Sequence, residues 1–501
     1  MRLLLTTIAA AFALTAPALA GAAPTITEYS AGITAGSAPH GIVAAGDGNL
    51  WFTGNGTPAR LGRITPEGVV TEFSAGLTSG GGPWGITAGP GGHLWFTENG
   101  MLGAVGRATT LGAVTLFTSG LTTGGELRDI VEGPDGNLWA TWSANPGRIV
   151  RMTPAGTITE FTAGLQNNNA PTGITAGPDG NVWFTEMSTP ARIGRITPDG
   201  VITEFHTGLT NGGAPQDIST GPDGNLWFTM RDGIGRITPE GVITEFTAGI
   251  TPGSRPAGIA AGPDGALWFT ASADPGRIGR ITTEGVATEF TAGITADAAP
   301  LGIAAGPDGN MWFTESDGDR IGRITTYPAV TSGVATLSGD TTASVTAAIT
   351  PNSQAAEFRV EYGPTTSYGS TTTPVAAAAS LSPVTVSAAL SGLAPGATTH
   401  YRTVATNASG TTYGPDRTID VPATPAASAP EPTPTVGRRV VAETLSGVIR
   451  VRRPGSSSFV TLDAASPVPV GSVIDSSKGR IAVVSALPGG LTQSATFWGG
   501  V

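Results

Sequence analysis

One tryptophan in about every 44 residues is the feature that most constrains this chain. The series is Trp51, Trp95, Trp139, Trp183, Trp227, Trp268 and Trp312, and one gap shortens to 41 residues. Each tryptophan lies in a unit P-x-G-I-x-x-G-P-D-G-N-L-W-F-T, followed by I-G-R-I-T-P-x-G and V-I-T-E-F. Four short apolar-alternating runs separated by turns are typical of one propeller blade. Residues 24–327 therefore predict a seven-bladed β-propeller. A β-solenoid, which would need capping ends, is the alternative.

The two ends of the repeat array are incomplete in a complementary way. The run Thr27–Tyr29 precedes any complete unit, and the last unit stops after Ile321–Thr325 without a T-E-F run. We expect the N-terminal strand to supply the missing outer strand of the last blade, which would close the ring and remove its open edges.

Turn residues and charges recur with the same period. Segments such as Pro134-Asp135-Gly136 predict plain turns rather than calcium loops, because the spacing lacks the dense oxygen ligands that calcium needs. An arginine recurs at Arg63, Arg107, Arg151, Arg195, Arg236, Arg280 and Arg323. A glutamate follows most of these arginines after nine residues, so we expect cross-strand ion pairs, with Arg323 paired to Glu28.

Composition agrees with an all-β protein. The 501 residues include 74 Gly and 39 Pro, and only 13% are charged. A net charge of −11 without a basic stripe argues against nucleic acid and anionic membranes as partners. The absence of cysteine excludes thiol catalysis, zinc–thiolate sites and disulfides.

The N-terminus has the pattern of a secretory signal. Arg2 precedes an apolar stretch, Leu3 to Leu14, and Ala18-Leu19-Ala20 forms an A-x-A cleavage site. Residues 1–20 therefore predict a signal peptide, and we expect a secreted protein, either extracellular or on the cell surface. The apolar run is short for a membrane anchor, and no later segment could span a bilayer.

One mouth of the propeller is the predicted site, because the innermost strands start around the central channel. The positions after each repeat's proline, which Leu127 replaces in the third repeat, are His40, Trp84, Arg128, Thr172, Gln216, Ala257 and Leu301. Glu126, Asp129 and Asp217 are neighbours of these positions. The loop after W-F-T, expected at the same mouth, carries Glu98, Trp142, Glu186, Met230 and Glu315. The repeats share their scaffold but differ here, which indicates one asymmetric site, with drift at an exposed rim as the alternative. The predicted ligand-binding residues are His40, Trp84, Arg128, Asp129, Thr172, Gln216 and Asp217.

The phrases G-I-T-A-G-P-D-G-N-V-W-F-T-E (173–186) and I-G-R-I-T-P-D-G-V-I-T-E-F (193–205) resemble the repeats of the streptogramin B (virginiamycin B) lyase family. The resemblance covers all seven units. It implies elimination chemistry that opens a cyclic depsipeptide with a magnesium ion. It also implies histidines in P-H-x-I phrases of the last two repeats, a glutamate two residues before one of them, and another glutamate shortly after the last W-F.

This sequence departs from most of that set. The histidine positions hold Ala257 and Leu301, the first glutamate position holds Ala299, and Glu315 lies one residue from the second. Only His40 repeats the P-H-x-I phrase, in the first blade, where the family tends to have tyrosine. Elimination needs a base poised near neutral pH and a cation or donors for the developing enolate. No metal ligand is therefore assigned, and magnesium is expected only if lyase activity persists. The catalytic candidates are His40, Glu126, Arg128 and Glu315.

The rest of the chain predicts further β structure. Residues 328–422 contain V-E-Y-G-P-T-T-S-Y-G and L-S-G-L-A-P-G and resemble a bacterial fibronectin type III β-sandwich. That resemblance implies a spacer or a polymer-binding module, with Thr399 at the expected tyrosine position and Tyr401 nearby. Residues 423–437 predict a Pro/Ala-rich linker. Residues 438–501 predict a small β-rich segment that weakly resembles FecR-type domains. This segment stops at Phe497–Val501, where we expect a further strand to start, which suggests a truncated reading frame.

Two functions stay open. The first is an exported binding or scaffold protein, expected to be a monomer, whose propeller mouth holds a small cyclic peptide, a glycan or a peptide. The second is a carbon–oxygen lyase of the streptogramin type. Export and the appended sandwich favour the first, and the seven-repeat resemblance favours the second.

Overall fold

The computed structural model describes residues 23–100, 103–166, 169–210, 212–423, 433–462, 465–489 and 491–499. The predicted signal peptide and most of the predicted linker lie outside these ranges. The chain divides into two compact units, Met1–Pro422 and Ala423–Val501.

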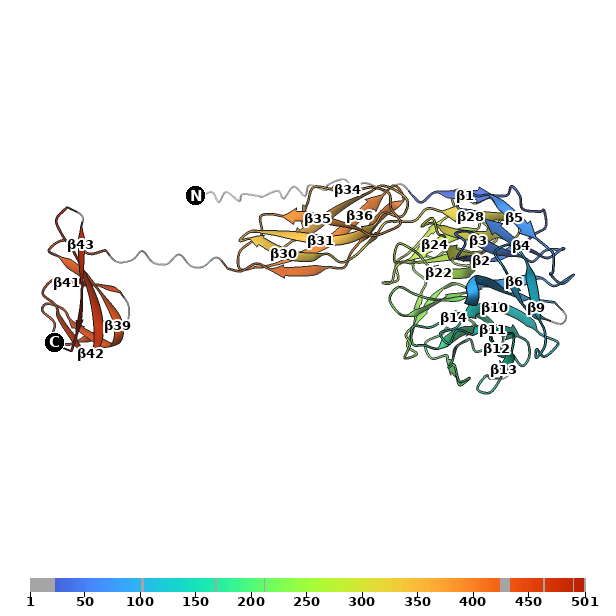
Figure 1. Cartoon of the computed structure of the whole chain (residues 1–501), viewed down its shortest axis with the longest axis horizontal. Coiled ribbons are helices and arrows are strands. Elements are labelled where there is room, and N and C mark those ends of the chain that lie inside the picture. Colours follow the sequence, from blue (N-terminus) through green and yellow to red (C-terminus); the bar gives the residue numbers. More distant parts are fainter. Residues whose placement is uncertain are drawn as a thin grey trace, which may run out of the picture. The chain divides into compact units, whose positions relative to one another are not determined.

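Seven four-stranded antiparallel sheets form the propeller, and the prediction of an all-β propeller fold is confirmed (Figure 1). Blade 1 contains β2 (Pro39–Ala44), β3 (Leu50–Gly54), β4 (Arg60–Ile64) and β5 (Val70–Phe73). Blade 2 contains β6 (Pro83–Gly89), β7 (His93–Glu98), β8 (Ala104–Ala108) and β9 (Val114–Phe117), with the 3-10 turn η1 (Pro90–Gly92) after β6. Blade 3 contains β10 (Glu126–Glu132), β11 (Leu138–Ser143), β12 (Arg148–Met152) and β13 (Ile158–Phe161). Blade 4 contains β14 (Pro171–Ala176), β15 (Val182–Glu186), β16 (Arg192–Ile196) and β17 (Ile202–Phe205).

The remaining blades follow the same order. Blade 5 contains β18 (Ile218–Thr220), β19 (Leu226–Met230), β20 (Gly233–Ile237) and β21 (Ile243–Phe246). Blade 6 contains β22 (Pro256–Ala261), β23 (Leu267–Ala271), β24 (Arg277–Ile281) and β25 (Ala287–Phe290). Blade 7 contains β26 (Pro300–Ala305), β27 (Met311–Glu315), β28 (Arg320–Ile324) and, as its outer strand, β1 (Ile26–Tyr29). Figure 1 shows β1 beside β28, and the register pairs Ile26 with Ile324.

The repeated aromatic residues form the interfaces between blades. Every repeat tryptophan is at most 1% exposed, and each stacks on an aromatic ring of its own outer strand. In blade 7 that ring is Tyr29 of β1, 5.4 Å from Trp312. Trp312 also packs with Leu50 and Phe52 of blade 1, so the apolar core continues from the last blade to the first. Burial of such large side chains stabilises each interface by about 2–3 kcal/mol per ring.

The glycine of I-G-R-I is required by this packing. In blade 4 a Cβ on Gly194 would lie 2.1 Å from the ring of Phe184, which covers it from the neighbouring strand. Any larger residue there would displace a fully buried phenylalanine.

The threonine of W-F-T links each blade to the next. In blade 4, Thr185 Oγ1 accepts a hydrogen bond from Gly173 N at 2.9 Å and donates one to Gln216 O of blade 5 at 2.6 Å. The same two bonds recur at Thr53, Thr97, Thr141, Thr229, Thr270 and Thr314. Because Thr314 donates to His40 O, this threonine ring runs through all seven blades without a break.

The predicted pairing of each repeat arginine with the glutamate nine residues later is wrong. In blade 4 the register places Arg195 opposite Thr203 and Glu204 opposite Gly194, so the two charged side chains project from opposite faces of the sheet. Glu204 instead pairs with Arg192 at 3.3 Å, and Arg195 pairs with the turn residue Asp179 at 3.7 Å.

The pairing predicted between Arg323 and Glu28 fails for the same reason. Glu28 pairs with Arg320 at 3.7 Å and accepts hydrogen bonds from Thr295. Arg323 lies 3.7 Å from Asp308, and its Nη1 donates to Pro66 O of blade 1 at 3.1 Å. Arg323 therefore joins blade 7 to blade 1, and Arg151, Arg195 and Arg236 join their blades to the following ones by the same kind of bond.

Residues 328–422 form two packed sheets. The first contains β29 (Ala329–Val330), β30 (Val334–Gly339), β31 (Thr342–Thr350) and β35 (Val384–Leu390). The second contains β32 (Ala356–Gly363), β33 (Ser370–Thr371), β34 (Val375–Ala377), β36 (Thr398–Asn407), β37 (Gly410–Tyr413) and β38 (Arg417–Asp420). Tyr401 is buried in the shared core, and its hydroxyl donates to Gly333 O at 3.1 Å and accepts from Ala335 N at 3.2 Å.

The second unit is one five-stranded sheet with a small core around Ile449 and Ile481. Its strands are β39 (Arg439–Arg452), β40 (Val460–Thr461), β41 (Ser466–Pro469), β42 (Val473–Ala486) and β43 (Thr492–Trp498). Within the described ranges, no helix combines the length and apolar character that a membrane crossing requires.

Candidate functional site

A cavity of about 820 Å³ opens at the propeller axis and is lined by the inner strands of the blades. All seven positions that follow the repeat proline, or Leu127 in the third repeat, line it, namely His40, Trp84, Arg128, Thr172, Gln216, Ala257 and Leu301. Asp129 and Asp217 line it one residue further along their strands. The structure thus brings every predicted ligand-binding residue to one cavity, because each lies just before or within the N-terminal half of an inner strand.

Three side chains from consecutive blades are stacked on one side of this mouth. The rings of His40 and Trp84 have centroids 3.8 Å apart at an interplanar angle of 40°. The guanidinium carbon of Arg128 lies 4.6 Å from the centroid of Trp84, within cation–π range. Arg128 also pairs with Glu126, whose side chain is 51% exposed. The mouth therefore presents a partly exposed aromatic face with a fixed positive charge beside it.

His40 is uncharged at neutral pH. Burial, together with a smaller effect of the positive charge of Arg128, lowers the pKa of its imidazole from 6.5 to about 4, against the opposing effect of a hydrogen bond with the Trp84 backbone. A base with a pKa this low accepts protons weakly near pH 7. His40 can therefore supply hydrogen bonds and ring contact at neutral pH, but it is poorly suited to abstract a proton.

Asp129 and Asp217 turn their carboxylates toward backbone amides rather than toward open cavity. Asp129 accepts from Ile130 N at 2.9 Å and from Ile174 N at 3.1 Å. Burial, with a further contribution from the charge of Asp217, raises the pKa of Asp129 to about 7 against the opposing effect of the two amides. Burial likewise raises the pKa of Asp217 to about 6 against its own two amide bonds.

The residues directly after W-F-T do not line this cavity, contrary to the expectation from sequence. Glu98, Trp142, Glu186 and Glu315 are at most 1% exposed, and Met230 is 4% exposed. Side chains alternate along a strand, and the preceding threonine already faces the ring of inner strands. The next residue along reaches the mouth instead, as Ser143, Met187 and Ser316 do, together with Asn55. Strand alternation counted from the threonine could have identified these four residues.

Glu315, a predicted catalytic residue, is placed inside blade 7. Burial, with a further contribution from the charge of Glu28, raises the pKa of its carboxyl to about 8 against the opposing charge of Arg320. Glu186 of blade 4 has the same arrangement with Glu204, and its pKa is also raised to about 8, mainly by burial. Both are structural carboxyl groups of the blade body.

Glu98 shows how the scaffold compensates for a change in one blade. Blade 2 has Leu116 where other outer strands carry glutamate. Glu98 takes over the missing role and accepts hydrogen bonds from Thr78 N at 3.0 Å and Thr78 Oγ1 at 2.6 Å. Glu72 holds Thr34 in the same way in blade 1.

The donor set does not fit the magnesium ion that the family resemblance implies. Ala257 and Leu301 line the cavity where the family has histidine, and neither can bind a cation. No cluster of three or more His, Asp or Glu side chains suited to a metal occurs in the described part of the chain.

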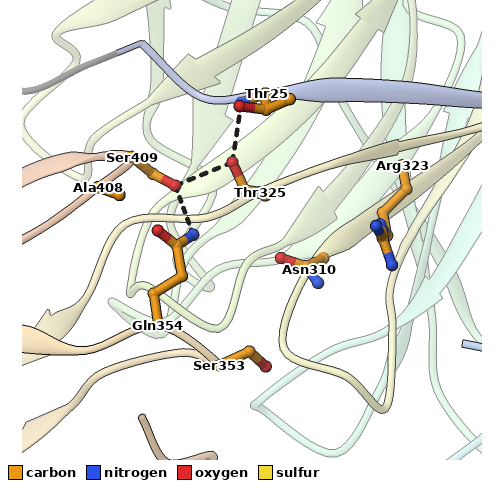
Figure 2. Close-up of a pocket in the computed structure, with 8 residues that line it drawn as sticks. All are labelled: Thr25, Asn310, Arg323, Thr325, Ser353, Gln354, Ala408 and Ser409. Carbon is orange, nitrogen blue, oxygen red and sulfur yellow. Dashed lines mark hydrogen bonds between the residues drawn. The ribbon is translucent and has the colours of Figure 1, made fainter. Parts of the chain in front are cut away.

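A smaller cavity of about 220 Å³ lies in the first unit where the last blade meets the sandwich segments (Figure 2). Its polar groups bond mostly to one another: Ser409 Oγ donates to Thr325 Oγ1 at 2.9 Å and Gln354 Nε2 donates to Ser409 Oγ at 2.7 Å. Arg323 is already engaged with Asp308. This cavity is therefore less suited to a ligand than the propeller mouth.

Comparison with known protein families and solved structures identifies relatives of the propeller. The virginiamycin B lyase family matches residues 20–125, 77–292 and 271–358. A streptogramin B lyase structure is 33% identical, with a TM-score of 0.55, over 60% of this chain and 97% of that one. The virginiamycin B lyase of Staphylococcus aureus is 34% identical, with a TM-score of 0.55, over 60% of this chain and 99% of that one. A catalytically inactive form of that enzyme with quinupristin is also 34% identical, at a TM-score of 0.54 and over 100% of its length. The chain has no significant match among curated protein sequences. More than half of the chain matches the family, and the chain therefore belongs to the virginiamycin B lyase family.

Proposed function

We propose that the protein is an exported ligand-binding protein whose propeller mouth holds a small organic ligand, such as a cyclic peptide, a short peptide or a glycan. The observation that carries this proposal is the stack of His40, Trp84 and Arg128 on one side of an 820 Å³ cavity. A cavity of this size suits a drug-sized molecule, and the partly exposed Trp84 supplies contact area at low entropic cost.

Binding is favoured over elimination because no base in the mouth is both poised near neutral pH and free to reach a ligand. His40 has a pKa of about 4, and the acidic side chains nearest the axis, Asp129 and Asp217, are held by backbone amides. With alanine and leucine at the family's histidine positions, no cofactor is assigned and no step through magnesium is proposed.

Lyase activity is the second candidate, because 33–34% identity extends over nearly the whole length of the streptogramin B lyases. In that case His40, Glu126 and Arg128 would have to replace the family's usual groups. The inactive enzyme studied with quinupristin suggests this depsipeptide as the probe for both candidates.

Calorimetry and mass spectrometry with quinupristin separate the two functions. We expect saturable heat of binding, a ring that stays closed with and without magnesium, and loss of binding in Trp84→Ala and Arg128→Ala. Trp498→Ala is the matched control, because this exposed tryptophan lies in the other unit. Magnesium-dependent ring opening that His40→Ala abolishes would overturn the preference for binding. Absence of heat with quinupristin and with a panel of cyclic peptides, peptides and glycans contradicts both candidates.

The proposed export has its own test. Expression of the complete chain in a secreting host should yield a mature protein that begins at Gly21, after the A-x-A site. N-terminal sequencing that finds Met1 on the purified protein contradicts export by this signal.

A further inference from the structure

The amide of the isoleucine in each inner strand points into the propeller channel. In blade 5, Gln216 N donates to Thr229 O and Thr229 N donates to Asp217 O, both at 3.0 Å. The ladder therefore uses the residues before Ile218, and Ile218 faces Phe228 in a non-hydrogen-bonded pair. Its N–H is left on the free edge of the inner strand, which faces the channel. The same isoleucine–phenylalanine register occurs at Ile42, Ile86 and Ile303.

Two carboxylates of the protein already occupy four of these seven amides. Asp129 bridges Ile130 N and Ile174 N, as described above. Asp217 bridges Ile218 N and Ile259 N, both at 2.8 Å. Each aspartate thus serves the amide of its own blade and that of the following blade, so a single carboxylate spans two adjacent amides.

The isoleucine amides of three consecutive blades have no aspartate carboxylate bound to them. The aspartate position holds glycine in blades 1, 2, 4, 6 and 7, at Gly41, Gly85, Gly173, Gly258 and Gly302. Ile303, Ile42 and Ile86 each have glycine at that position both in their own blade and in the preceding one. No carboxylate within the described ranges reaches them. The uncovered amides belong to blades 7, 1 and 2, where His40 and Trp84 also line the cavity.

We propose that the amides of Ile303, Ile42 and Ile86 form a carboxylate-binding site in the mouth. Asp129 and Asp217 show that equivalent amide pairs in this channel hold a carboxylate by two hydrogen bonds. A ligand carboxylate between blades 7 and 1, or between blades 1 and 2, takes the same position. This inference rests on the proposed binding function and names the ligand as an organic acid.

The groups around these three amides are suited to an organic acid. Converging backbone N–H groups form anion sites through their fixed partial charges. Arg128 supplies the adjacent positive charge, and its guanidinium leans over Trp84 toward blade 2. The ring of Trp84 offers a flat apolar surface beside these amides, which favours an acid that carries a planar or apolar group.

Benzoate is the probe for this site, and benzamide is its neutral control. The full-length protein is labelled with ¹⁵N only at isoleucine, and amide peaks are assigned by Ile42→Val, Ile86→Val and Ile303→Val. We expect saturable shifts of these three amides with benzoate and much smaller shifts with benzamide. Ile130, Ile174, Ile218 and Ile259 serve as internal controls that stay fixed, because aspartates already hold them.

Two variants sharpen the test. Asp217→Gly introduces the residue found in five of the blades, and we expect Ile218 and Ile259 to join the amides that respond to benzoate. Arg128→Gln should weaken benzoate binding about tenfold while the same amides still shift, because a charge-assisted contact is lost. Shifts that are uniform over all seven amides, absent, or equal with benzamide overturn the carboxylate site.

The outcome is separable from that of the proposed function. Quinupristin binding without a benzoate response leaves the mouth as a binding site and removes only the carboxylate assignment. Failure of quinupristin and the ligand panel, together with silent amides, removes both.

Discussion

Glu315 ends β27 against Glu28 of the N-terminal strand, and its replacement by glutamine tests whether the buried carboxyl is uncharged. Its pKa is raised from 4.5 to about 8, so the folded protein keeps a proton at pH 7 that the unfolded chain releases. The sign follows from linkage: the stability that this carboxyl contributes is fully present below about pH 4.5 and is lost as the pH rises toward 8. At about 1.4 kcal/mol per pKa unit, the loss reaches about 3 kcal/mol at pH 7.

Glutamine has the same shape and carries no such pH-dependent cost. We therefore expect the free energy of unfolding of Glu315→Gln to equal that of the original protein at pH 4 and to exceed it by about 3 kcal/mol at pH 7. Urea unfolding followed by tryptophan fluorescence measures this difference. The other titrating groups, including Glu186, cancel because both proteins contain them.

Glu160→Gln is the matched control. Glu160 pairs with Arg148 at 3.2 Å, and blade 3 has Trp142 where blade 7 has Glu315, so no second carboxyl lies beside it. This substitution should destabilise the protein by about 1 kcal/mol at pH 7, the opposite sign. If Glu315→Gln lowers stability equally at both pH values, Glu315 is ionised in the fold and the reasoning fails. Because Glu315 does not line the mouth, quinupristin and benzoate binding should not change.

Three further measurements test other parts of the molecule. Thr185→Val removes the hydroxyl that bonds to Gly173 N and Gln216 O, but these two groups keep their direct hydrogen bond of 2.8 Å, so the free energy of unfolding in urea should fall by about 1–2 kcal/mol. A change below about 0.5 kcal/mol refutes the linking role. The imidazole of His40 should titrate near pH 4 by NMR, and since its folded pKa lies below 6.5, its contribution to stability is full above that pH and is lost as the pH falls toward 4. A midpoint above pH 6 contradicts this placement. Tyr401→Phe should cost about 1–2 kcal/mol in thermal unfolding of the sandwich, and an unchanged transition shows that the bonds to Gly333 and Ala335 add nothing.

The fold and the cavity lining could be predicted from the sequence wherever one residue type recurs in every blade. The tryptophan spacing predicted the propeller, because each tryptophan fills an interface that only a blade repeat creates. The positions after the prolines were found because inner strands start there, and all seven line the cavity. Asp129 and Asp217 were singled out only as acidic neighbours of these positions.

Predictions that depended on register were less successful. A count of nine residues suggested that Arg195 faces Glu204, but a shift of one residue in a hairpin moves a side chain to the other face. For the same reason Glu315 and its counterparts, which were predicted to lie at the mouth, lie inside the blades. The free amides of Ile42, Ile86 and Ile303 could not be predicted, because they depend on the bulge before each isoleucine and on which neighbouring blade an aspartate reaches.

The threonine ring has a consequence for cooperativity. Every hydroxyl in it donates in the same rotational sense, from one blade to the following one, so the seven links form a closed cycle of aligned dipoles. Each link polarises the next, and interruption at any point converts the cycle into an open chain. The first threonine removed should therefore cost more than the second, whichever blades are chosen. Such non-additivity between blades on opposite sides of the axis would distinguish a circular network from seven independent contacts.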